Sequence, residues 1–315
     1  MATFSGIIVP ILTPFGSSPD QPLVPQAANS LIDHLVEVGV SGLFTFGSNG
    51  EFYVATDDER IAYTAHVVRR VAGQVPVIAG VGACSTRATC ELARRAQDVG
   101  ATGLSVVNPY FLQPTDDELV AHFEAVADVA EVPVLLYNIP KATGRTISPE
   151  VVAKLAAHPR IAGIKDSSGD LALLHAYLDA GKDYGLEVLV GSDGLISKAH
   201  ELGASGAVAG TANLVAPTVV GLWKALEAGD SAAAQELQAA VEPVRNVLHL
   251  GPVPQMLKRL VELAGYPVGP ARLPVGPPTP EAEQAARALV SELELSSAAE
   301  ALVDKMEEVA VALNA

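Results

Sequence analysis

Short apolar runs recur along the chain, and each is followed by a segment with helical spacing. The first residues of successive runs are about 20 to 35 positions apart, which is the length of one strand–loop–helix–loop unit. The runs are 7–12, 43–46, 77–81, 104–107, 134–137, 161–165, 188–190 and 207–209. They are apolar almost throughout, as parallel strands covered on both faces are. The pattern predicts eight strand–helix units in one sheet.

The helices between these runs carry recognisable start and stop signals. Thr56 and Thr115 each stand three residues before a glutamate, which is the spacing of a capping box. Ser148 precedes Pro149, a favourable pair at a helix start. Glycines at 39, 73 and 100 stand where helices should stop.

Eight such units favour an α/β fold of the (β/α)8 TIM barrel type. The alternative is a doubly wound open sheet, which usually carries a glycine-rich phosphate loop. The segment Gly80-Val81-Gly82-Ala83-Cys84-Ser85 lacks the third glycine of that motif, and the sequence has no Gly-x-x-x-x-Gly-Lys-Ser/Thr segment.

From about residue 216 the pattern changes to helices only. We expect helices at 217–227, 231–250, 254–264, 280–295 and 298–313, with a Pro/Gly-rich connector at 272–280. We therefore divide the chain into a catalytic barrel at 1–215, with its last helix at about 217–228, and a helical domain at 229–315. This C-terminal helical extension would pack on the barrel and is a candidate oligomer contact.

Composition narrows the class of protein. The 315 residues are 49% hydrophobic and 18% charged, which suits a large buried core, and the net charge of −16 argues against nucleic-acid binding. No apolar run reaches membrane-span length, the first ten residues lack a signal-peptide pattern, and no zinc-ligand spacing appears. We expect a cytoplasmic protein with no membrane contact, no metal, and Cys84 and Cys90 reduced.

Lys165 is the most informative residue. Of the eight lysines, it alone closes a short apolar run, at the end of Ile161-Ala162-Gly163-Ile164. An ammonium there is poorly solvated, so its pKa should fall, and the free amine can form a Schiff base with a carbonyl. The alternative is a lysine that merely extends its ammonium to solvent at a strand end.

In a barrel the active site lies at the carboxyl ends of the strands, where several other polar groups stand. Gly47-Ser48-Asn49-Gly50 is a turn able to cradle a carboxylate through backbone N–H groups and a hydroxyl. Tyr137 closes the neighbouring run and can relay protons, and Asp193 can accept substrate hydroxyls. The alternatives are an ordinary turn, a core tyrosine and a loop cap. Together these groups predict a 2-keto acid held as an imine, with C–C bond formation or cleavage at the adjacent carbon.

Three segments resemble the signatures of the N-acetylneuraminate lyase / dihydrodipicolinate synthase family. They are Gly47-Ser48-Asn49-Gly50-Glu51, Tyr137-Asn138-Ile139-Pro140 and Gly163-Ile164-Lys165-Asp166, and the similarity runs from about residue 4 to 295. The resemblance implies class I aldolase chemistry on pyruvate or a 2-keto acid in a homotetramer, without metal or organic cofactor. It also implies Lys165 as the Schiff-base lysine, Tyr137 as the proton relay, Ser48 and Asn49 as carboxylate ligands, and the Val208 backbone as pocket wall.

The chain departs from the synthases of that family at three positions. Their second tyrosine after strand 4 is Phe111 here, preceded by Tyr110, and their substrate-gripping arginine is Ala142. Lys141 is one residue away, but its ammonium is a point charge and cannot form the two parallel hydrogen bonds by which an arginine binds a carboxylate. The second turn residue is Asn49, where the synthases have threonine.

The segment Ala142-Thr143-Gly144 is more similar to 2-keto-3-deoxy sugar acid aldolases. Thr143 in this segment and Tyr110 at the end of the fourth run are further candidate substrate ligands. The Gly47-to-Phe52 and Lys165-to-Asp170 segments are similar to 4-hydroxy-2-oxoglutarate aldolases. The sequence thus favours a lyase acting on one of these substrate classes. The alternatives are 4-hydroxy-tetrahydrodipicolinate (dihydrodipicolinate) synthase, a dehydratase using the same imine, and a non-catalytic keto-acid-binding protein.

Overall fold

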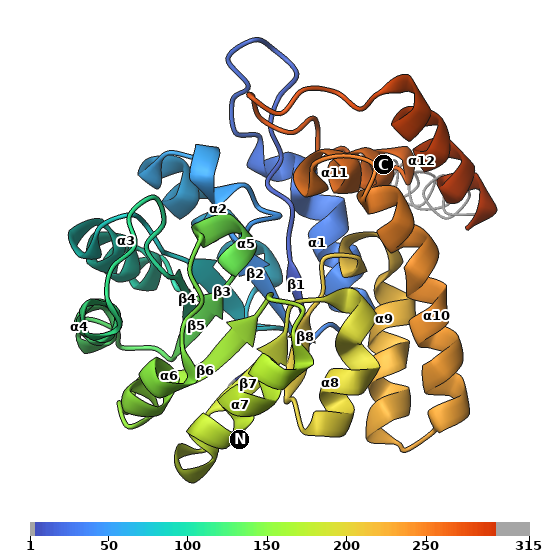
Figure 1. Cartoon of the computed structure of the whole chain (residues 1–315). Helices are drawn as coiled ribbons and strands as arrows, with labels where there is room; N and C mark the ends of the chain where they lie inside the picture. Colours follow the sequence, from blue (N-terminus) through green and yellow to red (C-terminus); the bar gives the residue numbers. More distant parts are fainter. Residues whose placement is uncertain (1–3, 294–315) are drawn as a thin grey trace.

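Eight parallel strands close into a barrel, in the order in which they occur along the chain (Figure 1). The computed structural model describes residues 4–293. The strands are β1 (Gly6–Pro10), β2 (Gly42–Thr45), β3 (Val77–Gly80), β4 (Gly103–Val107), β5 (Val134–Asn138), β6 (Ile161–Asp166), β7 (Glu187–Val190) and β8 (Gly206–Val208). Because β1 pairs with both β2 and β8, the sheet has no open edge. The predicted (β/α)8 barrel is therefore confirmed, and the open doubly wound sheet is excluded.

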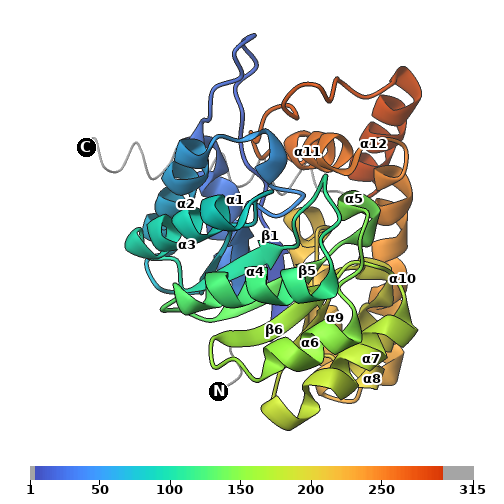
Figure 2. The same ribbon diagram turned by 60° about the vertical axis from the view of Figure 1, so that its left-hand side comes forward.

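Helices surround the strands, as the two views of the ribbon show (Figures 1 and 2). The α-helices are α1 (Asn29–Val38), α2 (Asp57–Val71), α3 (Thr86–Asp98), α4 (Asp116–Asp128), α5 (Pro140–Thr143), α6 (Pro149–Ala156), α7 (Leu171–Gly181), α8 (Ile196–Leu202), α9 (Ala212–Glu227), α10 (Ser231–Leu248), α11 (Val253–Leu263) and α12 (Pro280–Glu292). Short 3-10 turns are η1 (Pro25–Ala28), η2 (Phe52–Val54), η3 (Lys182–Tyr184) and η4 (Asp193–Leu195). No helix within residues 4–293 is long and apolar enough to cross a membrane.

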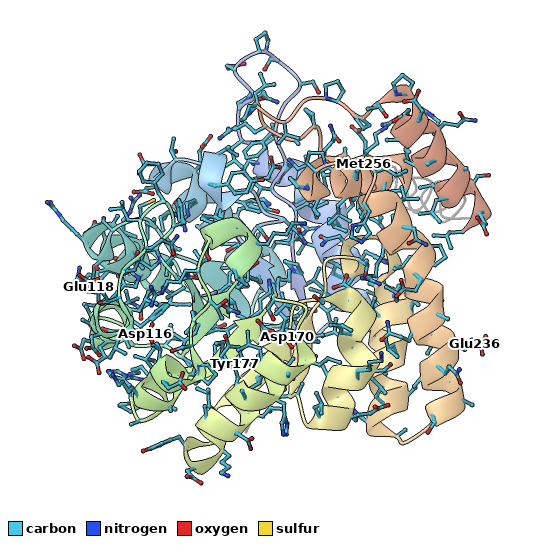
Figure 3. The ribbon with its side chains drawn as sticks, in the orientation of Figure 1. Asp116, Glu118, Asp170, Tyr177, Glu236 and Met256 are labelled. Carbon is cyan, nitrogen blue, oxygen red and sulfur yellow. The ribbon has the colours of Figure 1, made fainter. Side chains whose placement is uncertain are left out.

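The helix start signals act as the sequence predicts. Thr56 and Thr115 each accept a hydrogen bond from the backbone N–H of the glutamate three residues on, and each glutamate accepts one in return. Glu118 of this second capping box is labelled at the start of α4 in Figure 3. Ser148 caps α6 in the same manner, by accepting from Val151 N. These caps satisfy backbone donors that would otherwise lack partners in the first helical turn.

The core has two layers, because successive strand residues point to opposite sides of the sheet. The larger layer lies between strands and helices, and a smaller cluster that includes Phe44, Tyr137 and Val208 fills the barrel itself. In the register of β5 and β6, Tyr137 lies opposite Lys165 and Asn138 lies opposite Asp166. The pairing thus places the predicted phenol and amine side by side at the carboxyl ends of two neighbouring strands.

After β8 the chain is helical. Helix α9 is divided by a non-helical residue, Val215, into two helical segments. The second segment starts close to the expected position at Pro217, and the short first segment from Ala212 was not predicted. Pro217 lacks a backbone N–H, which suits it to the first turn of that second segment. Helix α10 lies beside α9, and α11 and α12 continue from it (Figure 1). The expected helix at 298–313 lies outside the described residues.

Candidate active site

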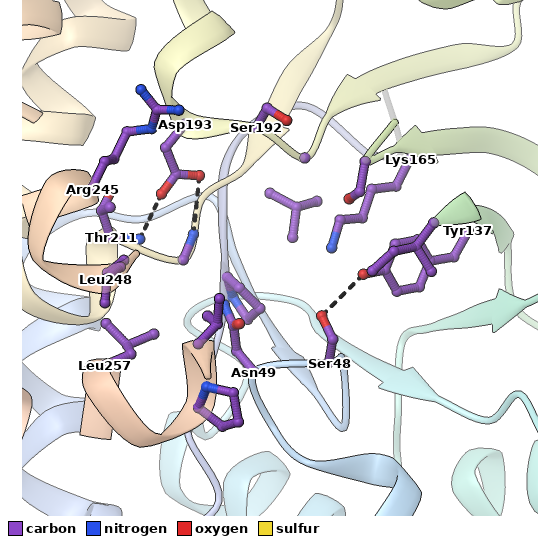
Figure 4. A pocket seen from close by; sticks show the side chains of 18 of the residues that line it. Ser48, Asn49, Tyr137, Lys165, Ser192, Asp193, Thr211, Arg245, Leu248 and Leu257 are labelled. Carbon is purple, nitrogen blue, oxygen red and sulfur yellow. Dashed lines mark hydrogen bonds between the residues drawn. The ribbon is translucent and has the colours of Figure 1, made fainter. Parts of the chain in front are cut away.

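A cavity of about 370 Å³ opens at the carboxyl ends of the strands (Figure 4). Six of the predicted site residues line it, and they come from five different strand ends: Ser48, Asn49, Tyr137, Lys165, Asp193 and Val208. Closure of the sheet is what brings these residues together, because they are spread over 160 positions of sequence.

Lys165 is buried, with 4% of its surface exposed. Its Nζ lies 4.1 Å from the centroid of the Tyr137 ring and 5.3 Å from that of Phe44. None of the ion pairs within residues 4–293 involves Lys165. A Cβ at position 191 would lie 2.9 Å from Lys165 Cε, so Gly191 leaves room for the side chain. The amine therefore stands at the cavity wall between aromatic faces.

The phenol of Tyr137 is connected to the turn after β2. Its hydroxyl lies 3.1 Å from Ser48 Oγ, at hydrogen-bonding distance, and Figure 4 shows both pointing toward the Lys165 amine. Tyr137 is 2% exposed, and its ring packs edge-on against Phe44. Packing fixes the ring, and the hydrogen bond fixes the hydroxyl. This arrangement can pass a proton between the phenol and a group bound beside the amine.

Side chains on the outer face of β5 and β6 hold these two strand ends together. Asn138 donates to Asp166 Oδ1 at 2.7 Å and accepts from Ile147 N at 3.0 Å. Ser168 donates to Asp166 Oδ2 at 2.6 Å, and burial raises the pKa of the Asp166 carboxyl. The residues after Tyr137 and Lys165 in the two motifs are thus structural, since they clamp the register that pairs the phenol with the amine.

Asn49 and Asp193 line the cavity from β2 and β7. The Asn49 amide nitrogen is 2.5 Å from where a Cβ of Gly210 would stand, so glycine is required there. Asp193 accepts from the backbone N–H groups of Gly210 and Thr211 at 3.3 and 2.7 Å (Figure 4). Burial raises the pKa of the Asp193 carboxyl. Both carboxylate oxygens of Asp193 therefore bind the loop that follows β8. This is the loop-cap role that the sequence analysis gave as the alternative to substrate binding.

Three of the predicted substrate ligands do not line the cavity. Gly47 packs against the Phe44 ring, Thr143 is buried and donates to Ile139 O and Arg145 O, and Tyr110 packs edge-on against Phe52. Burial raises the pKa of the Tyr110 phenol to about 12.

Two of the three positions at which the chain departs from the synthases, Phe111 and Ala142, also lie away from the cavity, whereas the third, Asn49, lines it. Phe111 is 91% exposed and has a φ of 82°, a left-handed conformation that is unusual for a side chain of this size. Lys141 and Ala142 are exposed on α5. Neither of these two residues lines the cavity that contains Lys165.

Helices α10 and α11 contribute a wall of the cavity that the sequence did not predict. Arg245 and Leu248 come from α10, His249 follows its last residue, and Leu257 comes from α11. Their spacing of three to four residues on α10 is the only sequence signal they carry, and it is shared by any helix with one inward face. Within residues 4–293 no group of three or more His, Cys, Asp or Glu side chains could hold a metal ion.

The turn that carries Ser48 and Asn49 is anchored by a buried ion pair. Glu51, which ends the turn and has a φ of 57°, lies 2.5 Å from Lys258 Nζ, and both side chains are essentially inaccessible. Arg272 N donates to the other Glu51 oxygen at 2.9 Å, and the Arg272 guanidinium pairs with Glu59. Burial lowers the pKa of the Lys258 ammonium to about 8, against the opposing effect of Glu51. Helix α11 thereby fixes the turn at the mouth of the cavity.

This anchor gives a prediction for stability. Lys258→Met should lower the free energy of unfolding by about 3–5 kcal/mol, because it leaves the Glu51 carboxylate buried without its counter-ion. The double variant Glu51→Leu/Lys258→Met removes both charges and should recover most of that loss. Urea unfolding midpoints of the three proteins test this. A single variant as stable as the parent would show that Lys258 does not neutralise Glu51.

Comparison with known proteins agrees with this geometry. The sequence profile of the Dihydrodipicolinate synthetase family matches residues 3–293. A 4-hydroxy-tetrahydrodipicolinate synthase of Methanoculleus marisnigri is 35% identical over 272 residues, which cover 86% of this chain and 93% of that protein. An uncharacterised DapA-like lyase of Halobacterium salinarum is 39% identical over 273 residues, covering 86% and 88%.

Solved structures show the same fold. YagE of E. coli K12, a protein of the dihydrodipicolinic acid synthase family solved in complex with pyruvate, superposes with a TM-score of 0.89 at 34% identity, covering 93% of this chain and all of that one. Dihydrodipicolinate synthase of Aquifex aeolicus superposes with a TM-score of 0.89 at 30% identity, covering 93% and 99%. The barrel, the lysine at the end of β6 and these matches lead to one conclusion: the chain belongs to the dihydrodipicolinate synthetase family of class I aldolases and lyases.

Proposed function

We propose that this protein is a lyase that forms a Schiff base between Lys165 and pyruvate or a 2-keto acid, and makes or breaks the neighbouring C–C bond. The observation that carries the proposal is the buried Lys165 amine, 4.1 Å from the Tyr137 ring centroid and without an ion-pair partner in residues 4–293, at the wall of the strand-end cavity. A buried lysine outside ion-pair distance of a carboxylate is a group that can attack a carbonyl carbon.

The reaction follows from the chemistry of the imine. The Lys165 nitrogen attacks C2 of the keto acid, and water leaves as the protonated imine forms. Loss of a proton from C3 gives an enamine, whose C3 attacks the carbonyl carbon of an aldehyde. The aldehyde oxygen takes up a proton, and water then releases the product and the free amine. Cleavage is the same sequence in reverse.

Other cavity residues have roles that fit these steps. Tyr137, held by its hydrogen bond to Ser48, is placed to deliver and accept the protons at C2 and at the aldehyde oxygen. The Ser48–Asn49 turn, fixed by the Glu51–Lys258 pair, offers N–H and amide donors for the keto-acid carboxylate. The Val208 backbone completes this wall.

The substrate classes we favour are 2-keto-3-deoxy sugar acids and 4-hydroxy-2-oxoglutarate-like acids. The rival, 4-hydroxy-tetrahydrodipicolinate synthase, is the name that several relatives carry. Against it stand the exposed Lys141 and Ala142 on α5 and the exposed Phe111, none of which lines the cavity.

A coupled assay separates these activities. Pyruvate release from 2-keto-3-deoxygluconate and from 4-hydroxy-2-oxoglutarate is followed with lactate dehydrogenase and NADH, and the condensation of pyruvate with aspartate semialdehyde is followed separately. We expect pyruvate release from at least one 2-keto acid at a kcat/KM at least tenfold above that of the condensation. A preference for aspartate semialdehyde would establish the synthase instead. Pyruvate binding without turnover of any of these substrates would establish a keto-acid-binding protein.

A further inference from the structure

The end of the cavity opposite Lys165 carries a second cation. Arg245 of α10 reaches the cavity wall beside Asp193, and in Figure 4 it stands across the pocket from Lys165. Its guanidinium occupies the space where a Cβ of residue 194 would stand, so the glycine there admits it. Among the residues of 4–293, the lysine and arginine side chains that line this cavity are Lys165 and Arg245.

The guanidinium retains donors for a ligand. Its Nη1 is 2.6 Å from both carboxylate oxygens of Glu242, one turn earlier on α10, and within residues 4–293 no other hydrogen bond or ion pair of the guanidinium is found. A guanidinium has five N–H donors in a planar fork, so Nη2 and Nε stay available. The Arg245 side chain is 30% exposed, so most of it is shielded from water.

The backbone gives the scale of the gap between the two cations. Lys165 Cε lies against Gly191 and the Arg245 guanidinium lies against Gly194. Two residues three apart have Cα atoms at most about 11 Å apart, and here the Leu195 N–H to Ser192 O hydrogen bond folds the stretch into a tighter turn. The two cations thus lie beside positions at most about 11 Å apart, and we take a keto acid of five or six carbons as the ligand to test across this gap.

The cation at this end of the cavity distinguishes a carboxylate from a neutral end. Leu248 and Leu257 make part of the wall apolar, while Ser192 and Thr211 line it with polar groups. A guanidinium can pair with a carboxylate in bidentate fashion. Both oxygens of Asp193 already accept backbone N–H bonds. His249, at the end of α10, adds a nitrogen at the rim and no negative charge.

We infer that Arg245 is a specificity-determining residue that binds a second carboxylate, at the far end of a 2-keto dicarboxylic acid of five or six carbons whose C2 is held by Lys165. This inference rests on the proposed function and narrows its substrate class. It predicts that the enzyme prefers 2-keto acids with a second carboxylate to 2-keto-3-deoxy sugar acids, whose far end is neutral. The carboxylate accepts hydrogen bonds from Nη2 and Nε of Arg245. Arg245 takes no part in breaking the C–C bond.

The test compares substrates that differ at the far end. Cleavage of 4-hydroxy-2-oxoglutarate and of 4-hydroxy-2-oxoadipate, which end in a carboxylate, is measured against 4-hydroxy-2-oxopentanoate, which ends in a methyl group. Arg245→Gln should reduce kcat/KM for the two acids by roughly 10–100-fold, mostly through KM, and leave the methyl substrate within threefold. Arg245→Lys should recover part of the loss.

Two controls separate this inference from the proposed function. Arg287→Gln removes an arginine that also pairs with a glutamate on its own helix, α12, but does not line the cavity, so it should change none of the three substrates. The pyruvate adduct trapped by borohydride should form equally in Arg245→Gln. Equal loss on all three substrates, or loss on none, would overturn the role of Arg245 alone. Absence of the adduct in the parent protein would overturn both proposals.

Discussion

Replacing Lys165 by alanine should reduce cleavage of the preferred 2-keto acid by about 10⁶-fold, since loss of a covalent nucleophile has effects of that order. Every step of the proposed reaction passes through the bond between Lys165 Nζ and C2. No second lysine or arginine side chain of residues 4–293 lies at that end of the cavity, because Arg245 stands opposite. The measurement is pyruvate release under saturating substrate.

Two further variants keep this result interpretable. Lys165→Met retains most of the buried aliphatic volume and should be equally inactive, which separates loss of the amine from loss of packing. Lys224→Ala removes an exposed lysine of α9 and should be fully active. The imine mechanism would be refuted if the Lys165→Met variant had the parent's thermal unfolding midpoint and kept more than a hundredth of the parent's activity.

Tyr137→Phe should reduce kcat by roughly 10²–10⁴-fold, the usual effect of losing a positioned acid–base group. The substitution removes only the hydroxyl that lies 3.1 Å from Ser48 Oγ and keeps the ring that packs against Phe44 and under the Lys165 amine. Folding should therefore be almost unaffected. The variant should slow both imine formation and C–C cleavage, because both steps need a proton transferred at the position of the phenol.

Stopped-flow measurement of imine formation with pyruvate, alongside steady-state kcat, tests the role of Tyr137. Ser48→Ala is the matched variant: it removes the partner of the phenol but not the phenol, and it should reduce kcat by a smaller factor. If Tyr137→Phe turned over at the parent rate, the proton relay would belong to another group.

Local pattern was sufficient for much of the fold. The eight strands and the capping boxes at Thr56 and Thr115 depend on residues within a few positions of each other, and the structure confirms them. The segment of α9 after the kink at Val215 starts close to Pro217, a good first helical residue, whereas the short segment from Ala212 carries no such start signal. The division into a barrel and a helical domain, the homotetramer and the cytoplasmic location stay predictions.

Local sequence pattern predicts only part of the candidate site. Residues at strand ends could be named because barrel topology places every strand's carboxyl end at one face. Glu51 and Lys258 are 207 positions apart in sequence, and their pairing depends on how α11 packs. Arg245 likewise reaches the cavity through the packing of α10 on the barrel, which no periodicity in the sequence specifies. Gly47, Tyr110 and Thr143 were named from their positions in the sequence, and they do not line the cavity.

The central claim is tested most directly by intact-mass spectrometry after treatment of the protein with pyruvate and sodium borohydride. The account predicts a mass gain of one reduced pyruvate per chain, mapped by peptide fragmentation to Lys165, and no gain in Lys165→Met. An adduct on another lysine, or none with pyruvate or with longer 2-keto acids, would contradict the assignment of Lys165 as the imine-forming residue.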